Sequence, residues 1–441
     1  MKYLPWLIAA VALAAIAAWP HYVNQSANAA RASSLPTMAP VVADYKTRDR
    51  LVAFWEKASN EHHRDDMISP RMLSGEYLQR YRERGDIGDV LRAEAAAKKS
   101  LRAQPRGNLA GELALATVYL TLHRFYDALA ITKDVERWDA GDQGIYIGEA
   151  SLDLEVGNFA AAAHRLAAVH GTNRNDAWRV VESRYLELTG HLAQARELLA
   201  TAAAYQNSNF DAPAQSRAWY FFRQGEMAFE AGDNDAALAF EHEAVTVFPH
   251  YADGFRVLAR IECSLHQWQQ CLADGQTSSN MVPYPETLGF VADAQTALGD
   301  TKGAQATNDV IRAVERIGNT QHISDRLLAI YYSEHGIHLH DAYRIARREL
   351  KVRDDVYTED TLGWAAAMDG HWAVARRAAA RATAYGTQDA RIQFHAGMIA
   401  LHFGEREEAR KRLEMALKQN RWFHPLYAEQ AERTLALLAH P

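Results

Sequence analysis

The chain has 441 residues, of which 48% are hydrophobic and 23% charged, and this composition excludes a disordered protein. Its formal charge of −7 is unevenly divided, with +4 over residues 1–104, −12 over residues 105–320 and +1 over residues 321–441. An acidic middle region repels phosphate backbones, so nucleic acid is not expected as a partner.

The N-terminus has the pattern of an export signal. Lys2 is followed by a mostly apolar run over residues 4–19, and Ala27-Asn28-Ala29 offers a small-x-small cleavage site. The run is long for a signal-peptide core and short for a full membrane span, so residues 1–29 are either a cleaved signal peptide or an N-terminal membrane anchor. In both cases Lys2 stays cytoplasmic and the rest is exported, which predicts a periplasmic or other extracytoplasmic protein, soluble or anchored by residues 4–19.

Residues 30–68 are predicted to form a linker and an N-terminal helix. The helix is expected from Asp44 to His63, with Leu51, Phe54 and Trp55 on one side.

Residues 69–424 contain a repeat of two helices. Each repeat contains a turn, usually a Gly followed by a polar residue. A small residue, which we call the slot residue, follows the first turn residue by five or six positions. Successive slot residues are separated by 34, 33, 42, 34, 33, 38, 33 and 34 positions, and they are Ala128, Ala162, Ala195, Ala237, Cys271, Ala304, Ala342, Ala375 and Ala409. Residues 72–105 form a tenth, degenerate copy. The two longer separations place extra residues between hairpins, around Tyr205–Gln215 and Ile317–His322.

This spacing predicts amphipathic helix hairpins that stack. A glycine in the left-handed conformation ends the first helix, and the slot residue lets the second helix approach it closely. One hairpin cannot bury its apolar face alone, so neighbouring hairpins must supply the rest of the core.

The pattern resembles the tetratricopeptide repeat family, best in Thr361-Leu362-Gly363-Trp364 through Ala375 and in Gly225 through Pro249. The stretch from Phe394 to Ala400 also resembles exported bacterial proteins of that family. The resemblance implies an all-α, right-handed solenoid of about nine to ten hairpins. Residues 425–441 are expected to form a C-terminal capping helix with Glu429, Glu432 and Arg433 on its polar outer face.

No catalytic constellation is recognisable, because phosphate loops, dinucleotide fingerprints and nucleophile elbows are all missing from the sequence. We therefore expect no enzyme and no cofactor. One histidine-rich turn, with His335, His338 and His340, could converge on a divalent metal and would make the chain an exported metal- or small-ligand-binding protein. The alternative is that these histidines are polar turn and cap residues.

The two cysteines, Cys263 and Cys271, are eight positions apart. On one continuous helix they would lie about 12 Å apart, too far for a disulfide. The hairpin register instead puts a turn near His266, so that they lie on facing helices, and an oxidising compartment would favour a bridge. Two buried free thiols remain the alternative.

The family resemblance also implies a partner-binding surface. In such solenoids the first helix of each hairpin lines a concave groove that captures a protein or peptide, here a partner in the cell envelope. Apolar anchors beside guanidinium groups would suit a peptide, whereas the alternative is that the aromatic residues are core. The implied groove residues are Arg184, Glu187, Trp219, Phe222, Glu226, Phe229, Arg256, Arg260, Asp293, Tyr331 and Trp364.

Overall fold

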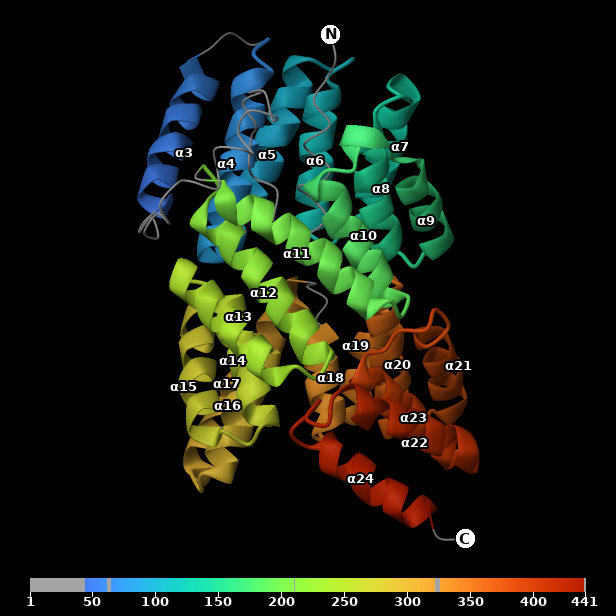
Figure 1. The fold of residues 1–441 in the computed structure, drawn as a ribbon. Helices are drawn as coiled ribbons and strands as arrows, with labels where there is room; N and C mark the ends of the chain where they lie inside the picture. The colour runs from blue at the N-terminus through green and yellow to red at the C-terminus, as the bar shows by residue number, and fades with distance from the viewer. Residues whose placement is uncertain (1–43, 62–64, 210, 322–325, 440–441) are drawn as a thin grey trace. The chain divides into compact units, whose positions relative to one another are not determined.

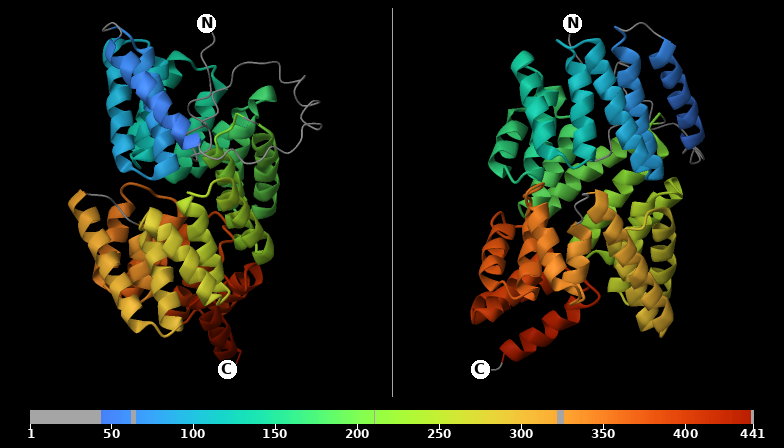
Figure 2. Two further views of the ribbon diagram at one scale, coloured as in Figure 1. Left: turned by 90° about the vertical axis from the view of Figure 1, so that its left-hand side faces the viewer. Right: turned by 180° about the vertical axis from the view of Figure 1, so that it is seen from behind.

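The computed structural model describes residues 44–61, 65–209, 211–321 and 326–439, and every regular element in these ranges is helical (Figures 1 and 2). After a leading helix α3 (Asp44–Glu61), twenty helices alternate as first and second members of hairpins, and a last helix α24 (Tyr427–Leu438) follows. The hairpins are α4/α5 (Ile68–Arg84, Ile87–Ala103), α6/α7 (Leu109–Thr121, Phe125–Trp138), α8/α9 (Gln143–Glu155, Phe159–Ala168), α10/α11 (Asp176–Leu188, Leu192–Ser208), α12/α13 (Ala214–Glu230, Asn234–Val247), α14/α15 (Ala252–Ser264, Trp268–Met281), α16/α17 (Pro285–Ala297, Thr301–Gln321), α18/α19 (Arg326–Glu334, Leu339–Glu349), α20/α21 (Val356–Met368, Trp372–Ala382) and α22/α23 (Ala390–His402, Arg406–Gln419).

The predicted all-α solenoid of about nine to ten hairpins is confirmed, because the described residues contain ten. All nine slot residues are buried, and the most exposed, Ala304, is 7% exposed. Close packing therefore occurs where the sequence placed small side chains. The degenerate first copy also forms a hairpin, α4/α5, with Val90 and Ala97 fully buried.

The turns within the hairpins use left-handed backbone, as expected. Seven of them hold a glycine with φ between 73° and 84°, and these are Gly85, Gly157, Gly190, Gly232, Gly299, Gly370 and Gly404. His123 and His266 take the same conformation with φ of 57° and 59°, which histidine tolerates better than most residues. The α18/α19 turn is one residue longer and has two left-handed residues, Gly336 and His338.

The chain divides into two compact units, a division that the sequence analysis did not predict. Unit 1 consists of Met1–Ser183, Glu197–Phe221 and Thr246–His250, and unit 2 of Arg184–Arg196, Phe222–Val245 and Tyr251–Pro441. At the start of unit 1, α3 to α6 pack around Val52, Tyr77, Leu78, Val90 and Val118. In unit 2, α16 to α24 surround a larger core that includes Tyr332, Trp364, Phe394, Leu413 and Tyr427.

The predicted N-terminal helix is present as α3, with Leu51 and Phe54 exposed and with Val52 and Trp55 packed toward the core. One local prediction was wrong. The stretch Tyr205–Gln215 is not a loop throughout, because α11 continues to Ser208 and α12 begins at Ala214. Part of the extra length in the longer repeats therefore extends second helices, and α17 likewise reaches Gln321.

The predicted signal or anchor, residues 1–29, lies outside the described residues. Within the described ranges, no helix combines the length and the apolar character needed to cross a bilayer.

Candidate functional site

The aromatic residues of the implied groove are buried in the protein core. Trp219, in unit 1, is 4% exposed and packs edge-on against Tyr220. In unit 2, Phe222, Phe229, Tyr331 and Trp364 are between 3% and 7% exposed. These side chains therefore fill space between helices and are not open anchors for a partner. Large aromatic rings gain more by burial in the core than in a partly exposed position.

Five of the six charged residues of the implied groove lie together in unit 2, partly buried, whereas the sixth, Asp293, pairs with His335 instead. We call the surface that the five form with their neighbours the first-helix face, because nearly all of its members lie on the first helices of successive hairpins, α10 to α22. It consists of Arg184, Glu187, Arg223, Glu226, Arg256, Arg260, Glu286, Arg326, Glu334, Arg353, Asp355 and Arg391. The register of the hairpins thus brings opposite charges from neighbouring helices together.

Most guanidinium groups on this face are matched to a carboxylate. Glu187 accepts from Arg184 at 3.0 Å and from Arg223 at 2.8 Å. Although burial alone would raise the pKa of Glu187, the two guanidinium groups lower it below its ordinary value. Further pairs join Arg256 to Glu286 at 3.0 Å, Arg353 to Asp355 at 3.0 Å and Arg391 to Glu334 at 3.5 Å.

Arg260 and Arg326 differ from the rest of the first-helix face. Among the described residues, neither has a carboxylate within ion-pairing distance, and each guanidinium instead lies over an aromatic ring. Arg260 lies 5.2 Å from the centre of Phe229, and Arg326 lies 5.7 Å from that of Tyr357. Burial lowers the pKa of Arg326, and the positive charges of Arg353 and Arg391 lower it further, against the attraction of Asp355. Two cations of this face are therefore without a close ion pair among the described residues.

Glu230 does not balance them. Its carboxyl oxygen Oε1 has no hydrogen-bond partner. Burial raises the pKa of Glu230 well above its usual value, and the negative charges of Glu187 and Asp389 raise it further. Burial thus favours the uncharged form of Glu230, so this carboxyl group is a poor counter-ion for Arg260 and Arg326.

The three histidines proposed as metal ligands do not converge. His335 uses both ring nitrogens, one on the Asp293 carboxylate and one on the Tyr331 carbonyl oxygen, each at 2.9 Å. His338 and His340 are exposed, and His340 lies 3.4 Å from Asp369. In the described part of the chain, no three His, Cys, Asp or Glu side chains are arranged to share a metal ion. The alternative interpretation, that these histidines are polar residues of a turn, describes them better.

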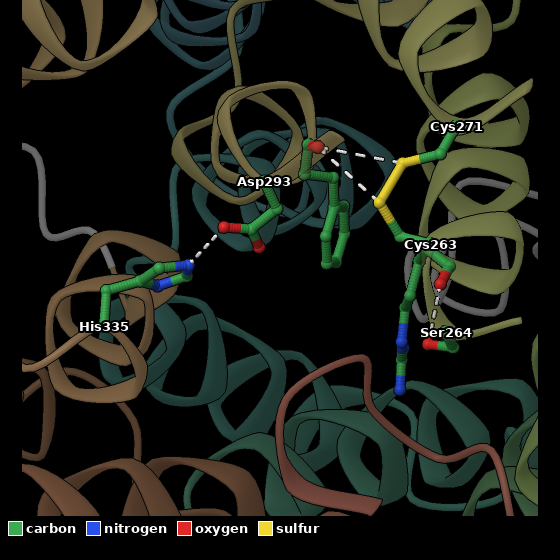
Figure 3. Close-up of a disulfide and its surroundings, with 7 residues drawn as sticks. Cys263, Ser264, Cys271, Asp293 and His335 are labelled. Carbon is green, nitrogen blue, oxygen red and sulfur yellow. Dashed lines mark hydrogen bonds and ion pairs between the residues drawn. A yellow bond between two sulfur atoms is a disulfide. The ribbon is translucent and has the colours of Figure 1, made fainter. Parts of the chain in front are cut away.

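Cys263 and Cys271 are joined by a disulfide that links α14 to α15 across the turn at His266 (Figure 3). The two Cα atoms are 5.2 Å apart, and both cysteines are fully buried. The two sulfur atoms lie 3.6 and 3.7 Å from the carbonyl oxygen of Phe290 on α16. Asp293, one turn further along α16, is the residue that pairs with His335 in the same view.

The segment between α23 and α24 packs against helices far from it in sequence. Asn420 donates to the Phe229 carbonyl at 2.6 Å and Gln419 to the Glu230 carbonyl at 3.0 Å. Both carbonyls lie in the last turn of α12, where helical N–H donors run out, and the Phe229 carbonyl also accepts from the Gly232 N–H at 2.9 Å. At the other end of the segment, the Tyr427 hydroxyl donates to the Glu334 carbonyl and accepts from the Trp364 indole.

Sequence reasoning missed Arg223, Arg326, Arg391 and the 419–427 segment. Arg223 follows the predicted Phe222 by one position, so a charge search along α12 could have found it. No sequence signal marks the contacts of residues 419–427, because they join positions up to 191 residues apart.

Comparison with known proteins finds similar chains only among solved structures. No family model matches the chain, and no curated protein matches it. Among solved structures it is similar to the Cut9–Hcn1 hetero-tetramer of the APC/C, with 14% identity, 90% of this chain and 69% of that chain covered, and a TM-score of 0.45. It is also similar to PilW, a type IV pilus biogenesis factor, with 15% identity, 47% and 94% coverage and a TM-score of 0.40. A tetratricopeptide repeat protein from Parabacteroides merdae has 18% identity, 60% and 99% coverage and a TM-score of 0.33.

The hairpins resemble tetratricopeptide repeats. The buried slot residues, the left-handed turns and the period near thirty-four residues support this description. What the similar proteins bind or assemble with remains a property of those proteins.

Proposed function

We propose that the chain is a non-catalytic scaffold of the cell envelope that captures an acidic segment of a partner protein on the first-helix face of unit 2. The observation that carries this proposal is the presence of Arg260 and Arg326, two guanidinium groups without a carboxylate partner among the described residues. A guanidinium offers a fork of donors that suits a carboxylate, and a partner carrying two carboxylates would match both groups.

The neighbouring ion pairs suit this role. Arg256 is already held by Asp253 and Glu286, so it is fixed in place one helical turn from Arg260. A fixed surface loses little side-chain freedom when a partner binds, which favours affinity. The Phe229 ring beneath Arg260 orients its guanidinium in the same way.

The binding surface can be tested by capture of partners from envelope extracts, followed by mass spectrometry. We expect proteins retained by the wild-type chain to be lost from the Arg260→Glu, Arg326→Glu double variant. Arg344→Glu is the matched control, because Arg344 is an exposed arginine of α19 away from this face. Retention of the same proteins by the double variant, with its helical content unchanged, would reject the surface.

The location in the envelope is supported by two features of the chain. The apolar run of residues 4–19 has the pattern of an export signal, and the buried Cys263–Cys271 disulfide is typical of oxidising compartments. Fractionation of cells, with N-terminal sequencing of the recovered protein, tests this location. A mature chain beginning near residue 30 would indicate a cleaved signal, and an intact N-terminus in the membrane fraction would indicate an anchor. Recovery of the intact chain from the cytoplasm would refute export.

A further inference from the structure

The first and last helices of the described chain differ in the side chains that they expose, although α24 also exposes Leu437 near its end. In the first two turns of α24, the exposed side chains include Glu429, Glu432 and Arg433. A polar outer face of this kind is what the end of a solenoid needs to remain soluble. On α3, the exposed side chains include Leu51 at 37% and Phe54 at 59%. The N-terminal end is therefore not capped in the same way.

Contacts with α4 hold α3 in this orientation. Val52 is 2% exposed within the unit 1 core, and Arg48 pairs with Glu76 and Glu83. On the same side, the Tyr77 hydroxyl bonds to Glu56. Rotation of α3 to bury Phe54 would break all of these interactions, so the apolar stripe stays on the outside.

Basic residues flank that stripe. Arg50 and Lys57 are exposed and lie four residues before and three residues after Phe54, on the same side of a helix. The nearest acid on the first turns, Asp49, is matched by Arg80 at 3.3 Å and Arg84 at 2.5 Å. Lys57 has only a 3.9 Å contact with Glu61. The outward face of α3 thus presents apolar side chains between cations.

We propose that the outward face of α3 rests on the surface of an anionic lipid bilayer. Leu51 and Phe54 would enter the headgroup boundary, while Arg50 and Lys57 would contact lipid phosphates, as in interfacial amphipathic helices. Helix α3 carries four basic and four acidic side chains, so the attraction to a negatively charged surface comes from the placement of Arg50 and Lys57 and not from the net charge of the helix. This inference is independent of the partner site on unit 2.

The position of α3 in the sequence favours a lipid surface over another protein. Helix α3 begins 25 residues after Trp19, the last residue of the apolar run. Even a fully extended chain of that length spans no more than about 90 Å, so α3 cannot lie farther than this from the end of the run. If the run is retained in the membrane, α3 is held near the lipid surface at high effective concentration. If the run is removed, the basic apolar stripe must bind the bilayer alone, and binding is weaker.

Hydroxyl-radical footprinting of the full chain, reconstituted in vesicles of saturated lipids, tests the proposal directly. The probe is oxidation of Phe54, and Leu437 of α24, which is 75% exposed, is the internal reference. We expect Phe54 oxidation to fall several-fold in phosphatidylglycerol vesicles relative to phosphatidylcholine vesicles, with Leu437 unchanged. Equal oxidation of Phe54 in both lipids would overturn the proposal.

Variants of α3 and control measurements distinguish binding to lipid from contact with another protein copy or with the rest of the chain. Replacing Arg50 and Lys57 by Gln should lower the affinity for anionic vesicles about 25-fold, at about fivefold for each basic residue. The matched control replaces Arg433 on α24 by Gln and should leave the affinity unchanged. Protection of Phe54 that grows with protein concentration in detergent would show that a second copy covers α3. Protection that is constant without vesicles would show that the chain covers it itself, and either result would reject the lipid surface.

Discussion

Unit 2 buries glutamates in two contrasting settings. Glu187, on the first-helix face, lies between the guanidinium groups of Arg184 and Arg223, and its pKa is lowered. Glu241, on α13, is fully buried, and neither carboxyl oxygen has a hydrogen-bond partner. Burial raises the pKa of Glu241 well above its ordinary value, and the negative charge of Glu226 adds to the effect. The pKa of a buried glutamate is therefore lowered in one place and raised in the other.

The difference between them comes from the helix that each glutamate faces. Glu187 faces the arginine-rich side of its neighbours, whereas Glu241 faces Gly225 on α12. A Cβ atom at position 225 would lie 2.2 Å from Glu241 Oε1, so only glycine leaves room for the carboxyl group. Close packing of a hairpin can thus bury a carboxyl group without supplying an ion-paired cation, and burial then favours its protonated form.

Removal of the paired glutamate should have the largest effect on stability. Glu187→Ala leaves Arg184 and Arg223 as buried like charges without their shared acceptor. We expect a loss of about 3 kcal/mol in the free energy of unfolding of unit 2, measured by urea denaturation at pH 7. Glu407→Ala, at an exposed position of α23, is the control and should change it by less than about 0.5 kcal/mol. A loss as small as that of the control would mean that Glu187 does not hold the pair.

The His335–Asp293 pair extends the comparison to a titratable cation. Although burial alone would lower the pKa of His335, the Asp293 carboxylate and the Tyr331 carbonyl raise it to about 9. A raised pKa contributes stability that is complete below the unfolded value near 6.5 and is lost as pH rises through 9. We expect the wild-type chain to lose about 2 kcal/mol between pH 6.5 and pH 9.5 from this pair. The His335→Gln variant should lack that loss, and equal pH dependence of both chains would count against the pair.

The unpaired carboxyl group predicts the opposite response to substitution. Glu241→Gln keeps the shape of the side chain and removes its ionisation. Because the pKa is raised in the folded state, wild-type stability should fall as pH rises above about 4.5, and the variant should not share this loss. We expect the variant to be more stable than wild type by about 1 kcal/mol at pH 8, with a smaller difference at pH 5. A variant less stable than wild type at pH 8 would reveal a partner for Glu241.

Removal of one partner of an exposed ion pair should have almost no effect on stability, and this is the smallest effect that we expect. Arg344 and Asp341, on α19, are 3.1 Å apart but have side chains that are 46% and 41% exposed. Arg344→Ala should change the free energy of unfolding by less than about 0.5 kcal/mol at physiological salt. Thermal denaturation at low and high salt would check this, and a loss near that of Glu187→Ala would contradict the role given to burial.

The spacing of small residues predicted most of the fold, because close helix packing depends on local volume. Ala162, Ala375 and Ala409 are fully buried where the register required, and the turn at His266 lies between Cys263 and Cys271 as that register implied. These features are decided within one hairpin, so the sequence of that hairpin is enough to reveal them.

The candidate site was predicted less well, because the direction in which a side chain points depends on packing between hairpins. Applying the same repeat positions to every hairpin placed Trp219 and Trp364 in the groove. Both are buried in the core instead, because burial of their large apolar area is favourable. The same repeat positions found Arg260 but not Arg326, whose helix begins at that residue. Which arginine lacks a carboxylate depends on neighbours from other hairpins, and that information lies outside any single repeat.

The covalent bridge across the α14/α15 turn has a consequence for proteolysis. A protease that cut the chain between Cys263 and Cys271, for example beside His266, would leave both pieces tethered through sulfur. The nicked molecule would migrate as one species on a non-reducing gel and separate into two fragments after reduction. Damage at this bend would therefore stay hidden until the molecule met a reducing environment.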